Sequence, residues 1–252
     1  MRGAFERRAA DLLFRRPLRM QNTKPLISFT FDDFPQSALH TGGVILQKYG
    51  LRGTYYASLG LVDSVAPVGR IFSREDLRTL LAHDHELGCH TYSHCHSWNT
   101  APAAFQKSLA DNEQQLAAWF PDVKFRTMSY PISGPRPGTK RRIARSFACC
   151  RGGGQVPNEG VADLNYLRAF FIEKATKDAT DISRAIERNA QANGWLIFAT
   201  HDVSESPTRF GCTPALFESV VQQSLSSGAT ILPVVEALKL VSGTNSNNGH
   251  RN

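Results

Sequence analysis

The chain has 252 residues, of which 41% are hydrophobic, and a formal net charge of +7. This length suffices for a full hydrophobic core. The chain could form one large α/β barrel or two small domains, and we expect a single domain. No apolar run approaches the roughly 20 residues of a membrane-spanning helix, and the apolar patch at residues 12–14 is too short for a secretory signal. Five scattered cysteines exclude a disulfide framework, so the sequence predicts reduced thiols and a cytoplasmic protein.

The two ends of the chain differ from its middle. Residues 1–23 form a basic arm, in which the first 19 residues hold six arginines against Glu6 and Asp11. We expect a solvated, partly frayed leader helix here; the alternative is a weak contact with an anionic membrane surface, and no nucleic-acid partner is expected. Residues 242–252 are rich in Asn, Gly and Ser, and we expect them to be disordered.

Between these ends, residues 24–241 alternate strand-like and helix-like segments. In the first half, strands are predicted at residues 26–31, 53–58 and 85–90, and a helix at residues 44–49. Ser73 opens a further helix with a capping box and Pro102 lies just inside the start of a longer one, which begins at Thr100.

The second half repeats the scheme. Helices are predicted at residues 139–146, at 178–193 and from Thr213 onward, and strands at residues 125–130, 147–151, 167–172, 195–200 and 230–232. Seven or eight βα units predict a distorted (β/α) barrel of the α/β class, similar to a TIM barrel, as one domain over residues 24–241.

Histidines are concentrated in one segment. Five of the eight lie between His83 and His96, and two of them are four residues apart, at His90 and His94. This spacing is expected to bring both imidazoles to one side of a single helical turn, as a divalent metal requires. The first strand ends in Asp32 and Asp33. Two imidazoles and a carboxylate leave positions open for water, so the pattern predicts a metal-dependent hydrolase.

Four remote segments are expected to meet at one place. Asp32 and Asp33 end one strand, and His90, Pro131 and His201 each follow another. In a β/α barrel the carboxyl ends of the strands converge on one mouth, where catalytic groups collect.

The same residues carry a family resemblance. Thr30-Phe31-Asp32-Asp33, His90-Thr91-Tyr92-Ser93-His94, Tyr130-Pro131 and His201-Asp202 resemble, in order and approximate spacing, the motifs of the polysaccharide deacetylases. These are metal-dependent carbohydrate esterases related to chitooligosaccharide and peptidoglycan deacetylases. The resemblance spans residues 24–240 and is specific as a set.

The resemblance implies removal of an acetyl group from an N-acetylated saccharide. It implies that Asp33, His90 and His94 hold a divalent metal, usually zinc, and that Asp32 is the general base. His201 would protonate the leaving amine. The oxyanion and substrate would be held by the backbone N–H of Ile132 and by the Tyr130-Pro131 turn before it. Independently of the resemblance, Trp98 lies beside the histidine run and is expected to stack on a sugar ring as a platform.

Two departures from the family pattern stand out. The first motif commonly continues with Gly, where this chain has Phe34-Pro35, so the rim beside the base is expected to be bulkier. The third motif commonly has an arginine two residues before the proline, which orients the base; here that position is Ser129. The candidates to replace it in space are Arg126, Arg136, Arg151 and Arg168.

Three alternatives remain at this stage. The catalytic set does not encode the acyl group, so the same fold can hydrolyse another non-peptide C–N or ester bond. An inactive, metal-retaining carbohydrate-binding protein is favoured if nothing replaces the missing arginine. A non-haem iron oxygenase also uses two histidines and a carboxylate, but usually on an all-β scaffold.

Two further features have ordinary interpretations. Cys89 and Cys95 flank the histidine run and could add thiolate ligands, but we expect buried thiols. The glycine run at residues 152–154 could cradle an anionic group, but a flexible loop is the expected interpretation.

Overall fold

A computed structural model describes residues 2–132, 134–175 and 180–243. The expected disordered tail lies outside these residues from position 244 onward, and so do the first two residues of the helix predicted at 178–193. In the described part of the chain, no helix is both long and apolar enough to cross a membrane.

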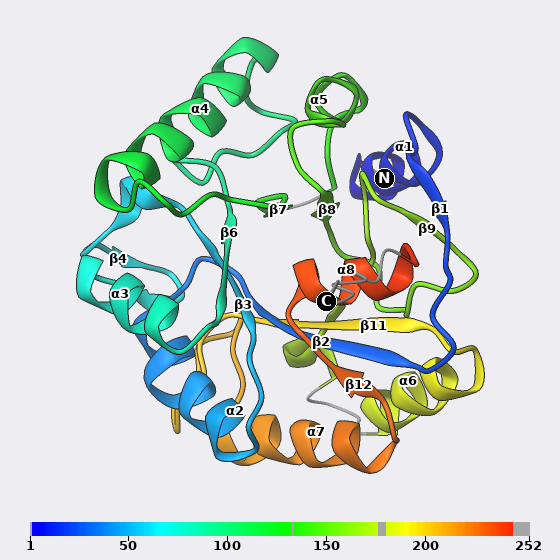
Figure 1. Ribbon diagram of the computed structural model, residues 1–252. Coiled ribbons are helices and arrows are strands. Elements are labelled where there is room, and N and C mark those ends of the chain that lie inside the picture. Colours follow the sequence, from blue (N-terminus) through cyan, green and yellow to red (C-terminus); the bar gives the residue numbers. More distant parts are fainter. Residues whose placement is uncertain (1, 133, 176–179, 244–252) are drawn as a thin grey trace, which may run out of the picture.

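Parallel strands curl into a partial barrel with helices around it (Figure 1). In the described residues the main sheet has eight strands: β2 (Leu26–Phe31), β3 (Thr54–Ala57), β6 (Glu86–Cys89), β7 (Thr127–Ser129), β8 (Cys149–Arg151), β10 (Phe170–Phe171), β11 (Trp195–Thr200) and β12 (Thr230–Ile231). Their order is β10-β11-β2-β3-β6-β7-β8, and β12 pairs with β2. The predicted distorted β/α barrel of seven or eight strands is confirmed.

Helices connect the strands in the order expected of βα units. They are α2 (Val44–Lys48), α3 (Arg74–Ala82), α4 (Pro102–Trp119), α5 (Pro137–Ile143), α6 (Thr180–Gln191), α7 (Pro214–Ser226) and α8 (Val234–Val241). The capping box is confirmed, since Ser73 and Asp76 exchange both hydrogen bonds at the start of α3. The start of α4 differs from the prediction. Its N-cap is Ala101 rather than Thr100, and Pro102 supplies the first helical residue.

The centre of the sheet is formed by β2 and β11. All six residues of each strand are buried, and the two pair in parallel along their whole length, from Leu26 opposite Trp195 to Phe31 opposite Thr200. Near-continuous apolar runs are typical of parallel strands covered on both faces. This arrangement fixes the ends of β2 and β11, and therefore the residues that follow them, beside each other.

The helix α8, which the sequence did not reveal, covers the amino end of the barrel (Figure 1). The backbone N–H of Val234 donates to Thr54 Oγ1 and that of Val235 to Glu86 Oε2, both at 2.9 Å. Thr54 and Glu86 are the first residues of β3 and β6. The carboxyl ends of the strands are left for the site.

The N-terminal arm packs on the barrel. Its helix α1 (Arg2–Leu12) buries Ala10 completely, and β1 (Pro17–Arg19) pairs antiparallel with β9 (Val161–Asp163). The fully buried Lys140 donates from Nζ to Ala10 O and to Asp163, both at 2.6 Å. A buried ammonium requires such partners, so the arm supplies part of the structure instead of fraying into solvent.

Candidate active site

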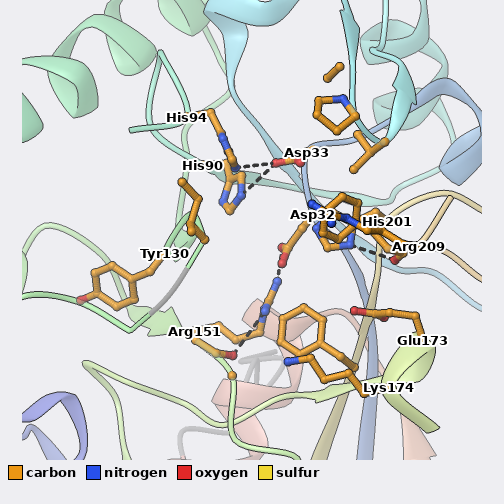
Figure 2. Close-up of a pocket in the computed structure, with 18 of the residues that line it drawn as sticks. Asp32, Asp33, His90, His94, Tyr130, Arg151, Glu173, Lys174, His201 and Arg209 are labelled. Atoms are coloured by element: carbon orange, nitrogen blue, oxygen red, sulfur yellow. Dashed lines mark hydrogen bonds and ion pairs between the residues drawn. The ribbon is translucent and has the colours of Figure 1, made fainter. Parts of the chain in front are cut away.

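A pocket of about 980 Å³ lies where the carboxyl ends of the strands converge. Its walls come from segments far apart in the chain, and several of them carry side chains expected from the sequence (Figure 2). The expected residues that line it are Asp32, Asp33, His90, His94, Tyr130, Ile132 and His201. Pro131 and Trp98 do not line it.

Asp33, His90 and His94 form a cluster on one wall of this pocket. Asp33 Oδ1 lies 3.2 Å from His90 Nε2 and 2.9 Å from His94 Nε2. Their potential ligand atoms all lie within 4.8 Å of one another. Burial alone raises the pKa of Asp33, but its close contacts and charge interactions with the two histidines lower that pKa well below its ordinary value.

The backbone brings these residues together without a helical turn. Thr91 and His94 have φ of 61° and 50°, so residues 90–94 form a loop and the expected turn of helix is wrong. Asp33 also has a positive φ, of 60°, directly after β2. Left-handed backbone in residues other than glycine costs energy and is found where a site demands it. The bend at Asp33 turns its side chain away from that of Asp32.

The cluster fits a divalent metal. His90 is buried, and its Nδ1 lies 2.8 Å from the carbonyl of Ser129, which fixes the proton on Nδ1 and leaves the Nε2 lone pair directed at Asp33. Asp33 Oδ1 is buried and faces the two imidazole Nε2 atoms without a hydrogen bond of good geometry among the described residues. A buried carboxylate oxygen beside two imidazoles is a donor set that suits zinc.

The adjacent Asp32 has a different partner. It is buried and pairs with Nη2 of Arg151, whose side chain is only 1% exposed (Figure 2). The guanidinium also lies over the rings of Tyr56 and Phe171, with its Cζ 5.0 and 5.7 Å from their centroids. These contacts leave the arginine little freedom, so the carboxylate is held in one orientation.

Arg151 supplies the arginine that the family pattern leads one to expect at Ser129. The two residues are paired in register on neighbouring strands, Ser129 ending β7 and Arg151 ending β8. Ser129 Oγ is buried with no hydrogen-bond partner among the described residues. Of the four candidate arginines, Arg151 reaches Asp32, and it does so from the strand next to the one that carries Ser129.

The turn after β7 brings Ile132 to the pocket. Ile132 lines the pocket, is 68% exposed and has a φ of 70°, an outlier for a β-branched residue. Tyr130 also lines the pocket, but its hydroxyl donates to Asn165 O at 3.1 Å. Pro131 is buried behind them and shapes the turn.

His201 lies on the opposite wall, directly after β11 (Figure 2). Its Nδ1 lies 3.1 Å from Phe210 O, so Nδ1 carries the proton towards that carbonyl and Nε2 is the other nitrogen. Asp202 does not orient this imidazole. It accepts hydrogen bonds from Thr208 N and Oγ1, at 2.7 and 2.6 Å, and thereby holds the loop that follows.

One expectation is not met in the site, whereas the expected burial of the Cys89 thiol is confirmed. Trp98 donates from Nε1 to Gly134 O at 2.9 Å and supports the loop behind the pocket, so it is not a sugar platform. Cys89 is buried and accepts from Asn112 Nδ2, and burial raises the pKa of its thiol to about 12. A protonated thiol is a poor metal ligand, and neither Cys89 nor Cys95 joins the metal cluster formed by the described residues.

Sequence reasoning missed one wall of the pocket. Phe171, Glu173 and Lys174 line it from β10 and the short helix η3 (Ile172–Ala175), and Arg209 and Phe210 line it from the loop after β11. Phe171 falls within the strand predicted at residues 167–172. The other four residues lie outside any periodic pattern, and their signal was their position shortly after a predicted strand. Burial raises the pKa of Glu173 to about 8.

Comparison with known sequences identifies a family. The family model for polysaccharide deacetylase matches residues 19–148, just over half of the chain. A gellan lyase from Bacillus sp is 23% identical over 207 residues, which make up 75% of this chain and 8% of that enzyme. The chain thus spans a small part of the length of this curated relative.

Solved structures share the fold. The Xyl-CE4 domain of a multidomain xylanase from the hindgut metagenome of Trinervitermes trinervoides has a TM-score of 0.62 at 18% identity, covering 89% of this chain and 94% of the domain. The chitin deacetylase of the fungal pathogen Colletotrichum lindemuthianum has a TM-score of 0.61 at 18% identity, covering 86% and 89%. A CE4 family pseudoenzyme from Bacillus anthracis has a TM-score of 0.61 at 12% identity, covering 88% and 68%.

The fold, the order of the motifs and the family match agree. The matched residues include Asp32, Asp33, His90 and His94, and the remaining site residues Arg151 and His201 follow on the same sheet. The chain therefore belongs to the polysaccharide deacetylase family.

Proposed function

We propose that this protein removes the acetyl group from an N-acetylated saccharide with the help of a divalent metal, most naturally zinc. The observation that carries the proposal is the separation of the two adjacent carboxylates. Asp33 faces two imidazoles, whereas Asp32 pairs with Arg151 in the same pocket. One carboxylate is thus arranged as a ligand and the other as a base.

Asp33, His90 and His94 would hold the metal. When bound, a divalent metal polarises the acetamide carbonyl and lowers the pKa of water towards about 7. The hydrogen bond from His90 Nδ1 to Ser129 O keeps the ligand nitrogen of that ring directed at the site.

The protein's own groups then move the protons. Asp32, oriented by Arg151, accepts a proton from the attacking water. The backbone N–H of Ile132 donates to the oxygen of the acetyl group as it becomes negative. His201 gives a proton to the leaving amine from Nε2, because Nδ1 is engaged with Phe210 O.

Two other functions from the same fold compete with this proposal. The inactive binding protein was favoured if nothing replaced the missing arginine, and the buried pair of Arg151 with Asp32 supports activity instead. Hydrolysis of another non-peptide C–N or ester bond uses the same groups, so the choice of acyl group has to be measured.

The decisive test is acetate release together with metal analysis. Protein purified with zinc is expected to hold close to one equivalent and to release acetate from N-acetylglucosamine oligomers. His94→Ala is expected to lose both metal and activity, because the remaining donors are too few. His83→Ala is the matched control, since His83 is an exposed histidine at the end of α3. Normal metal content in His94→Ala would contradict the proposed ligand set.

The compartment is also a proposal. Cys89, Cys95, Cys149, Cys150 and Cys212 are all free thiols. Free thiols support a reducing environment, so we propose that the protein is cytoplasmic and acts on a saccharide made inside the cell.

A further inference from the structure

Cations and aromatic rings alternate along the wall that holds His201. Lys174 Nζ lies 4.4 Å from the centroid of the Phe171 ring, and that ring stacks on His201 with centroids 6.3 Å apart. On the other side, His201 and Phe210 have centroids 5.5 Å apart, and Arg209 Cζ lies 4.6 Å from the Phe210 ring. Lys174 and Arg209 therefore flank the candidate acid, one on each side.

Both cations line the pocket without a carboxylate to neutralise them. Among the residues that the structure describes, neither Lys174 nor Arg209 has an acidic oxygen within ion-pair distance. The third cation of the pocket wall, Arg151, differs from them because it is paired with Asp32. Glu173 lies beside Lys174, and with a pKa of about 8 it carries a proton at neutral pH and leaves the lysine charge in place.

A glycine loop adds backbone donors next to Lys174. Gly153 and Gly154 line the pocket, and a Cβ built on Gly153 would lie 3.3 Å from Cε2 of Phe171, the ring that Lys174 covers. Neither glycine donates its N–H to another described residue. Successive backbone N–H groups beside a cation are a common way to bind an anionic oxygen.

We propose that this wall is an anion subsite and that the substrate is an N-acetylated saccharide bearing a carboxylate or a phosphate. The anionic oxygen would lie between Lys174 and the glycine loop or beside Arg209, while the acetamide faces the metal cluster and His201. The proposal rests on the proposed deacetylase function and adds to it the chemical class of the sugar.

The test compares sugars that differ in charge. The probes are N-acetylglucosamine, its 1-phosphate, its 6-phosphate and the corresponding uronic acid, with affinity measured by calorimetry and acetate release measured separately on zinc-loaded protein. At least one anionic sugar is expected to bind about tenfold more tightly than the neutral one, an effect of two cations at a pocket rim. The phosphate and carboxylate arms show which anion the wall prefers. The advantage should shrink as salt is raised.

Substitutions assign the effect to the wall. Lys174→Ala with Arg209→Ala is expected to reduce the affinity ratio of anionic over neutral sugar to about twofold or less. Both side chains are exposed, so the doubly substituted protein should fold. Lys124→Ala is the matched control because Lys124 is exposed and precedes β7, at the end of the strand opposite the pocket.

Each outcome supports or overturns the anion subsite and the deacetylase function separately. Equal affinity for neutral and anionic sugars, or a preference that persists in the doubly substituted protein, overturns the anion subsite whether or not acetate is released. Preferential binding that the double substitution removes, without acetate release from any sugar, supports the subsite and overturns the deacetylase. Preferential binding and faster acetate release from the anionic sugars support both.

Discussion

Arg151 and Ser129 lie opposite each other on β8 and β7, and the arginine reaches across to Asp32 from the strand next to the serine. The position that commonly carries the family's arginine is thus occupied by a small residue whose Oγ is buried without a partner among the described residues. In this chain the positive charge that pairs with Asp32 comes from the neighbouring strand. This relationship leads to the first prediction.

Arg151→Ala is expected to lower kcat by about 10²-fold while metal content stays close to wild type, because the base loses its orientation and the ligands stay intact. It should also lower the free energy of unfolding by about 3 to 5 kcal/mol, since it leaves Asp32 buried without its ion pair. Kinetics, elemental analysis and denaturant unfolding measure the three effects.

A relocated arginine provides the control. Arg151→Ser combined with Ser129→Arg is expected to recover part of the lost kcat, because the two positions are neighbours in the sheet. Wild-type kcat in Arg151→Ala would show that the base needs no such partner.

The two adjacent aspartates are expected to behave differently when each is changed to asparagine. Asp32→Asn should keep the metal and lower turnover by about 10² to 10⁴-fold, because it removes only the proton acceptor. Asp33→Asn should lose metal and activity together, because Asp33 faces both imidazoles. Metal analysis and acetate release on the same preparations distinguish the two. The reverse pattern would exchange the roles of Asp32 and Asp33.

Much of this site could be read from the sequence because it depends on local patterns. The apolar runs of β2 and β11 predict buried parallel strands, and polar residues directly after such strands converge at one end of a barrel. The proposed ligand set of Asp33, His90 and His94 follows from the resemblance to the family's motifs, and these three side chains do lie together in the structure.

What the sequence could not predict depends on three-dimensional pairing. Arg151 was one of four candidates, and only the register of β7 with β8 places it at the base. The spacing of His90 and His94 is compatible with a helical turn, but the positive φ of Thr91 and His94 makes it a loop. Lys174 and Arg209 come together through the sheet order, which no periodicity reveals.

The N-terminal arm is expected to contribute to stability. Deleting residues 1–20 removes β1, the partner of Lys140 at Ala10 O, and Arg16, whose Nη2 donates to Ala148 O. Because Lys140 is fully buried, losing one of its two acceptors should lower the melting temperature by several degrees or more. Thermal unfolding checks this. Arg19→Ala, an exposed change on β1, is the control and should unfold like wild type. An unchanged melting temperature after the deletion would show that the arm contributes nothing to stability.

The last prediction concerns the pH dependence of stability. Burial raises the pKa of Glu173 from its ordinary 4.5 to about 8, so between these values the folded protein binds a proton that the unfolded chain releases. The stabilisation that this bound proton provides is therefore fully present below about pH 4.5 and is lost as the pH rises through about 8. The free energy of unfolding declines over this range by at most about 1.4 kcal/mol per pH unit. Glu173→Gln is expected to flatten this decline in the free energy of unfolding, measured by denaturant titration from pH 5 to 9. Glu187→Gln, on the exposed face of α6, should keep the wild-type slope. If Glu173→Gln and wild type decline in parallel, the carboxyl of Glu173 ionises as it does in the unfolded chain and the pocket wall beside Lys174 carries a negative charge at neutral pH.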